Sequence, residues 1–194
     1  MKVTIAQLNP TVGDIQGNLD KAVAALALAS ADQSDLIIFP ELFLTGYPPL
    51  DLLEKAWFIK KVRHAAKQLM AVSKKYPSTG IIIGAPWPTE LKTGKGLYNA
   101  ALFIHNGKLL GVQAKTLLPT YDVFNETRYF DPAATIRPVR FKGEKIGISV
   151  CEDAWNIEEL WPNRRLYNEE PVSILAKKGA TLIVNISASP FLIG

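Results

Sequence analysis

The single cysteine of this chain, Cys151, lies where an apolar segment meets two acidic residues. Residues 147–151 predict a buried strand that ends at the cysteine, and Glu152 and Asp153 follow it directly. A lone cysteine is most often a small buried hydrophobe. Here the strand would place the sulfur at a sheet edge beside polar groups, where α/β proteins gather their active sites. We therefore treat Cys151 as a candidate nucleophile.

A thiol nucleophile needs a proton acceptor, and histidine is its usual partner. The chain has two histidines: His64 lies in a predicted helix, and His105 lies beside a predicted hairpin turn. Both are explained as ordinary polar residues, and neither has an obvious carboxylate to orient it. One cysteine and two separated histidines also make a poor zinc site, so we expect no bound metal.

Glu41 and Lys115 offer another way to activate the thiol. The apolar run 36–39 leads to Glu41, and the predicted strand 108–115 ends at Lys115. Taken singly, these residues fit a loop acid and a charged edge-strand residue. Together with Cys151 they place a carboxylate, an ammonium and a thiol at three strand ends. A carboxylate can take the thiol proton, and an ammonium can lower the thiol pKa and stabilise an oxyanion. This set suffices for amide hydrolysis through a thioester.

A layered fold is needed to bring these strand ends together. Alternating or continuous apolar runs predict strands at 2–8, 36–39, 80–85, 97–105, 108–115, 137–141, 145–150 and 181–186. Helices are predicted from an Asn18 cap to about residue 31, from an Asp51 cap to about residue 75, and over 168–178. Asn106-Gly107 and residues 142–144 predict hairpin turns. Interleaved strands and helices indicate an α/β domain.

Composition limits the classes of protein that the chain can represent. Its 194 residues are 48% hydrophobic, which fits one domain over 1–194. The net charge is +4, and the basic doublets are scattered, so we expect no nucleic-acid partner. One cysteine forms no internal disulfide, which favours the cytoplasm. The longest apolar stretch, 22–29, is far short of the ~20 residues that span a bilayer, so we expect no membrane partner.

Four ordered blocks of the sequence carry a family resemblance. They are residues 39–53 (FPELFLTGYPPLDLL), 115–130 (KTLLPTYDVFNETRYF), 151–155 (CEDAW) and 185–191 (NISASPF). The Glu, Lys and Cys within them resemble the triad of the nitrilase, or carbon–nitrogen hydrolase, superfamily. The full blocks are similar to the N-terminal glutaminase domains of glutamine-dependent NAD synthetases. The resemblance implies a four-layer α-β-β-α sandwich.

The resemblance also implies a role for individual residues. Glu41 would be the general base, Cys151 the nucleophile and Lys115 the oxyanion-stabilising cation, with Glu126 supporting them. The positions that contact glutamine in the family correspond to Tyr121, Glu152, Trp155 and Ser189. A glutamate after the nucleophile is reasonable, because the α-ammonium of glutamine needs an anionic partner.

The activity implied is hydrolysis of L-glutamine to glutamate and ammonia. A synthetase domain would use the ammonia to amidate deamido-NAD, and the enzyme would be a homo-oligomer. Because the family domain continues past the position of Gly194 with a substrate-binding basic residue, we expect this chain to lack the last strands and to turn over poorly alone. No ATP-binding loop occurs in the sequence, so ATP and magnesium would belong to the synthetase domain. Two alternatives are an amidase for another small amide and an inactive fragment or assembly module.

Overall fold

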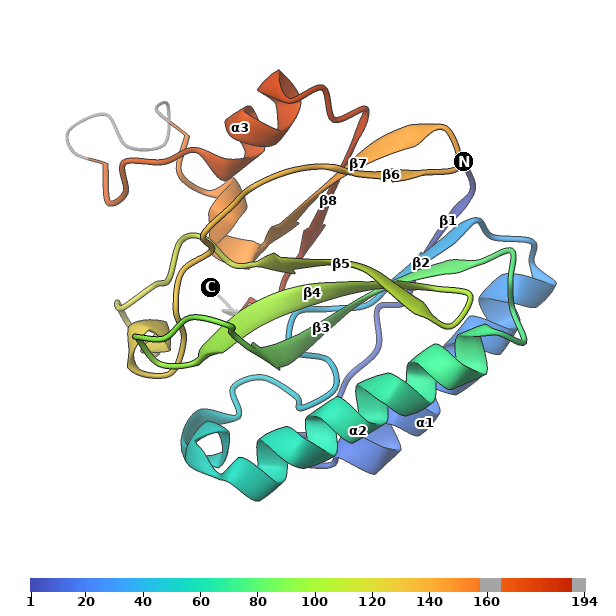
Figure 1. Ribbon diagram of the computed structural model, residues 1–194, viewed down its shortest axis with the longest axis horizontal. Coiled ribbons are helices and arrows are strands. Elements are labelled where there is room, and N and C mark those ends of the chain that lie inside the picture. Colours follow the sequence, from blue (N-terminus) through green and yellow to red (C-terminus); the bar gives the residue numbers. More distant parts are fainter. Residues whose placement is uncertain (158–164, 190–194) are drawn as a thin grey trace, which may run out of the picture.

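The chain forms two mixed β-sheets that pack face to face (Figure 1). The computed structural model describes residues 1–157 and 165–189. The first sheet has the order β1 (Val3–Ile5), β2 (Leu36–Ile38), β3 (Gly80–Pro88), β4 (Leu97–His105) and β5 (Lys108–Ala114). The second has the order β6 (Val139–Phe141), β7 (Glu144–Val150) and β8 (Leu182–Ile186). β1, β2 and β3 run parallel, β3 to β5 antiparallel, and β7 pairs parallel with β8 and antiparallel with β6.

Helices cover the outer faces of both sheets. α1 (Ile15–Ala31) and α2 (Ala56–Ser73) lie side by side on the five-stranded sheet, and α3 (Pro171–Lys177) lies on the three-stranded sheet (Figure 1). The period-two alternation of β7 explains this order. Ile146 and Ile148 point into the core between the sheets, whereas Gly147 faces Leu175 of α3. The described residues therefore form α-β-β-α layers, as the family resemblance implied.

Short 3-10 turns, rather than regular helices, carry several residues of interest. They are η1 (Leu50–Glu54), η2 (Glu126–Arg128) and η3 (Cys151–Ala154). η3 follows β7 without a break, so Cys151 is the first residue after the strand rather than its last. Likewise β5 ends at Ala114, one residue before Lys115.

Both predicted helix caps are wrong. α1 begins at Ile15, because the Asp14 carboxylate accepts the Gly17 N–H, and Asn18 lies buried inside the helix. The Asn18 side chain instead holds the segment before the helix, exchanging two hydrogen bonds with the backbone of Thr11. Asp51 lies within η1, and its carboxylate pairs with side chains of the η2 region. Asn18 thus binds the chain just before the helix, and Asp51 binds residues far away in the sequence, so neither caps a helix.

The predicted hairpins are confirmed, and the bounds of several other predicted elements shift. Asn106 and Gly107 both have positive φ, as a two-residue turn requires, and Lys142 and Gly143 repeat this geometry. The strand predicted over 2–8 pairs only over 3–5, and the helix predicted over 168–178 covers 171–177. Among the described residues, no helix is both long and apolar enough to cross a membrane.

Candidate active site

Glu41 lies in the loop after β2, against β3. The Gly84 N–H donates to the Pro40 carbonyl, and the Leu44 N–H donates to the Gly84 carbonyl. A Cβ atom at Gly84 would collide with the backbone of residues 40–42. The glycine therefore permits the close approach that seats Glu41 at the end of the sheet.

A buried ion triad joins the ends of β2 and β5 to η2. The Lys115 Nζ lies 3.0 Å from Glu41 Oε1 and 2.8 Å from Glu126 Oε1. All three side chains are buried, with Glu41 fully shielded from solvent. Burial lowers the pKa of Lys115, but the two carboxylates outweigh it and leave the pKa raised, so the amine stays cationic. Burial also raises the pKa of Glu41, against the opposing charge of Lys115, which makes this carboxylate a better base.

Three further donors fix the two carboxylates. The Asn99 Nδ2 donates to Glu41 Oε1 at 2.7 Å and to Glu126 Oε2 at 3.2 Å. The Tyr47 hydroxyl donates to Glu126 Oε1 at 3.1 Å, and the Ala188 N–H donates to Glu41 Oε2 at 3.0 Å. Each glutamate is thus held from several elements, which restricts its orientation.

The Cys151 thiol faces this triad from the second sheet. Its pKa is raised to about 12, mainly by burial, then by the charge of Glu41 and a hydrogen bond to it, against the lowering effect of Lys115. The thiol is therefore protonated at neutral pH and needs a base. Its backbone φ of 45° is unusual for a residue with a side chain. Such conformations cost of order 1–3 kcal/mol and cluster at functional sites.

Asp153 ties the cysteine turn to the segment that carries the lysine. Its Oδ1 accepts the N–H groups of Thr116 and Leu117, both at 2.9 Å, and its Oδ2 accepts the Val150 N–H at 3.1 Å. Burial raises its pKa to about 6, in spite of these three hydrogen bonds. The carboxylate thus sets the spacing between Lys115 and Cys151 across the two sheets.

Glu152, the residue after the cysteine, is a further buried carboxylate. The Tyr121 hydroxyl donates to both its oxygens, at 2.9 and 2.8 Å, and the Tyr167 hydroxyl donates to Oε1 at 3.2 Å. Burial, and then the carboxylate, raise the pKa of both phenols, so they remain donors. Trp155 is half exposed at the end of η3. Ser189 is exposed and directly follows Ala188, whose N–H binds Glu41.

The structure therefore brings Glu41, Lys115, Glu126 and Cys151 together. Glu152 lies in the cysteine turn itself, and Tyr121 is hydrogen-bonded to it. Sequence reasoning missed four polar side chains of this region: Tyr47, Asn99, Asp153 and Tyr167. Asn99 had a signal, because it is an amide within an otherwise apolar strand. Tyr47 and Asp153 lie inside the blocks that carried the family resemblance, and Tyr167 had no local signal.

Metal binding finds no support in the part of the chain that the structure describes. No group of three or more His, Cys, Asp or Glu side chains there is placed to hold a metal ion. The four carboxylates of this region, Glu41, Glu126, Glu152 and Asp153, are instead engaged by the lysine, amide, phenol and backbone donors described above.

Comparisons with known structures define the class of fold. The synthetase structure from Acinetobacter baumannii, a glutamine-dependent NAD+ synthetase, matches with a TM-score of 0.83 and 31% identity, covering 99% of this chain and 33% of that one. An amidase from Nesterenkonia sp. matches with a TM-score of 0.78 and 22% identity, covering 96% of this chain and 64% of that one. The molecule thus has the nitrilase-type α/β fold.

The chain belongs to the carbon–nitrogen hydrolase family, whose model matches residues 2–192. It is 41% identical to the glutamine-dependent NAD(+) synthetase of Synechocystis sp., covering 99% of this chain and 34% of that protein. It is 39% identical to the enzyme of the same name from Thermotoga maritima, covering 100% of this chain and 31% of that protein. The chain thus spans about a third of the length of these relatives.

Proposed function

We propose that this chain hydrolyses the side-chain amide of L-glutamine through a thioester on Cys151. One observation carries the proposal: a buried lysine lies between two carboxylates, and one of these faces the only cysteine. A base, an oxyanion-stabilising cation and a nucleophile are the groups that amide hydrolysis requires. The glutamine-dependent relatives support the choice of substrate.

Glu41 and Lys115 have different roles in the acylation step. Glu41 takes the thiol proton as the sulfur attacks the amide carbon, and Lys115 stabilises the resulting oxyanion. When this intermediate collapses, the C–N bond breaks and Glu41 passes the proton to the departing amine, which leaves as ammonia. The raised pKa of Glu41 suits both directions of transfer.

Hydrolysis of the thioester by water uses the same two side chains. Glu41 removes a proton from the attacking water, and Lys115 stabilises the second tetrahedral oxyanion. The C–S bond breaks, glutamate is released, and the sulfur regains its proton from Glu41. Glu126 and Asn99 keep the lysine and the base in place through both halves of the reaction.

Glu152 is the proposed partner of the α-ammonium of glutamine. It is a buried carboxyl group that directly follows the nucleophile, and the hydroxyls of Tyr121 and Tyr167 donate hydrogen bonds to its oxygens. Trp155 and Ser189 would contribute further substrate contacts from the turn and from the segment after β8. In the complete enzyme, a cytoplasmic homo-oligomer, the ammonia would pass to a synthetase domain that amidates deamido-NAD.

The primary test replaces the nucleophile. Cys151→Ala should abolish the slow glutamate release expected of this chain alone while leaving the circular dichroism spectrum unchanged, because the smaller side chain removes only the sulfur. An electrophilic glutamine analogue should add once to the wild-type chain, as seen by intact mass, and excess glutamine should protect. Glutamate release that survives in Cys151→Ala would place the nucleophile elsewhere and refute the proposal.

A second test addresses the substrate. Glu152→Gln should raise KM for glutamine but not for propionamide, which has no α-ammonium. Glu90→Gln removes an exposed carboxylate that is not among the residues of the site and serves as the matched control. Equal KM changes for both amides would support an amidase acting on another small amide.

A further inference from the structure

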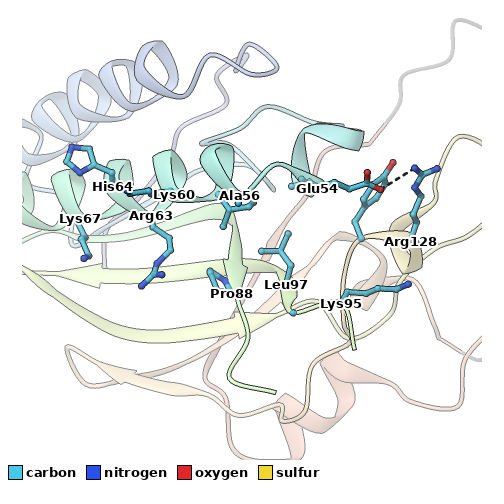
Figure 2. Close-up of a pocket in the computed structure, with 14 residues that line it drawn as sticks. Glu54, Ala56, Lys60, Arg63, His64, Lys67, Pro88, Lys95, Leu97 and Arg128 are labelled. Atoms are coloured by element: carbon cyan, nitrogen blue, oxygen red, sulfur yellow. Dashed lines mark hydrogen bonds and ion pairs between the residues drawn. The ribbon is translucent and has the colours of Figure 1, made fainter. Parts of the chain in front are cut away.

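A groove outside the proposed active site gathers the positive charge of the molecule (Figure 2). It encloses about 740 Å³ between α2, the ends of β3 and β4, and the η2 turn. None of the proposed catalytic or glutamine-contacting residues lines it. Its volume is within the roughly 300–1,000 Å³ of small-molecule sites.

Five lysine and arginine side chains line this groove against one carboxylate. They are Lys60, Arg63, Lys67, Lys95 and Arg128, and the carboxylate is Glu54. Their surplus of four positive charges equals the net charge of the whole chain. The rest of the sequence therefore balances, and cations from three separate segments of the chain line one groove.

Most of these cations have no protein partner. Arg128 pairs with Glu54 at 3.2 Å and with Asp51 at 3.0 Å, as the dashed line to Glu54 in Figure 2 shows in part. The side chains of the other four are exposed and form no ion pair with any residue in 1–157 or 165–189. The groove therefore presents unneutralised charge to an anion.

The positions of the cations on α2 oppose helix stability. Lys60, Arg63 and Lys67 follow one another at spacings of three and four, where like charges repel, and α2 contains no acidic residue to offset them. In Figure 2, Arg63 and Lys67 extend from α2 toward the strands. A bound anion would relieve this repulsion.

The dimensions of the groove indicate which kind of anion would fit it. Lys60 and Lys67 are about 10 Å apart along the helix, at 1.5 Å per residue, which suits a chain of phosphates better than a single one. Beside the cations, Pro88, Leu97 and Tyr129 give the groove an apolar wall. Such a wall fits a planar ring.

We propose that this groove binds a nucleotide bearing two or more phosphates. The phosphates bind Lys60, Arg63 and Lys67, and the base lies against Pro88 and Leu97. The proposal is independent of the glutamine reaction, because the two sites share no residue.

The test is calorimetric titration of the chain with ADP, without added metal. We expect one saturable site, with affinity falling as NaCl rises from about 50 to about 300 mM, since screening shortens the reach of exposed charges. Pyrophosphate should compete with ADP but bind more weakly, and adenosine alone should not bind. Arg63→Gln/Lys67→Gln should weaken ADP binding at least about tenfold.

The matched control is Arg140→Gln/Lys177→Gln, which removes two exposed cations from β6 and α3 on the other sheet. Its ADP affinity should equal that of the wild type. The proposal is overturned if ADP shows no saturable binding at low salt, or if both double variants lose equal affinity. Tighter binding of polyglutamate or of a single-stranded oligonucleotide than of ADP would also overturn it, in favour of a macromolecular partner.

Discussion

Replacement of Lys115 by methionine tests whether the ion triad is shielded from water as completely as the structure shows. Lys115 is 1% exposed, and its two carboxylate partners are 0% and 4% exposed. Methionine keeps much of the apolar stem but removes the charge. Glu41 and Glu126 would then face each other with only Asn99, Tyr47 and the Ala188 N–H as donors.

The expected loss of unfolding free energy is about 3–5 kcal/mol, the usual consequence of removing one partner from a buried ion pair. That is a large part of the ~5–15 kcal/mol that stabilises a typical domain. The loss should depend on pH. Without the lysine, repulsion and burial raise the pKa of one carboxyl above its unfolded value of about 4.3. The protonated carboxyl contributes stability to the folded variant below that value, and this contribution is lost as pH rises through the folded pKa. The loss of unfolding free energy relative to wild type should therefore be larger at pH 8 than at pH 5.

Urea unfolding of Lys115→Met and wild type at the two pH values measures this deficit. Lys142→Met is the control, because its partly exposed amine pairs with Asp35 at the surface, where about 1 kcal/mol or less is expected. Adding Glu126→Gln to Lys115→Met should recover part of the loss, about 0.5–3 kcal/mol of coupling. A Lys115→Met deficit no larger than that of Lys142→Met, or one independent of pH, would refute the reasoning.

Three further substitutions probe the supports of the site. Gly84→Ala should lower stability by about 1–3 kcal/mol and slow alkylation of Cys151, because its Cβ displaces the segment carrying Glu41; thermal unfolding and intact mass would show this. Asp153→Asn turns an NH2 group toward the Val150 N–H and should cost about 1–3 kcal/mol. Folding raises the pKa of Asp153 from 3.8 to about 6, so the protonated form contributes stability below pH 3.8 that is lost as pH rises through about 6. The difference in unfolding free energy between wild type and Asp153→Asn, measured with urea, should therefore be smaller at pH 7 than at pH 4. Tyr167→Phe should raise KM for glutamine with little change in kcat, and a fall in kcat alone would contradict this role.

Local sequence patterns predicted the elements that carry the site. Apolar runs directly before Glu41, Lys115 and Cys151 placed these residues at strand ends, because the period of a strand is set by its own backbone. The turns at Asn106-Gly107 and Lys142-Gly143 were also predicted from the local sequence, since a positive φ restricts the residues that can occupy them. The ordered family blocks then indicated which strand ends belong to one site.

Tertiary structure alone decided which polar groups meet. Asn99 reaches Glu41 across 58 positions, and Tyr167 reaches Glu152 from beyond the turn, so neither contact follows from spacing. The predicted cap Asp51 failed for the same reason, because Tyr129, 78 positions away, binds its carboxylate, whereas Asn18 binds the backbone of Thr11 just before the helix. Burial between packed layers sets the pKa of the thiol and the pairing of the lysine. Charges from α2, the loop before β4 and η2 converge on one groove because the sheets fold those segments together. A sequence pattern specifies one element at a time, whereas distances between elements and exclusion of water exist only after the layers pack.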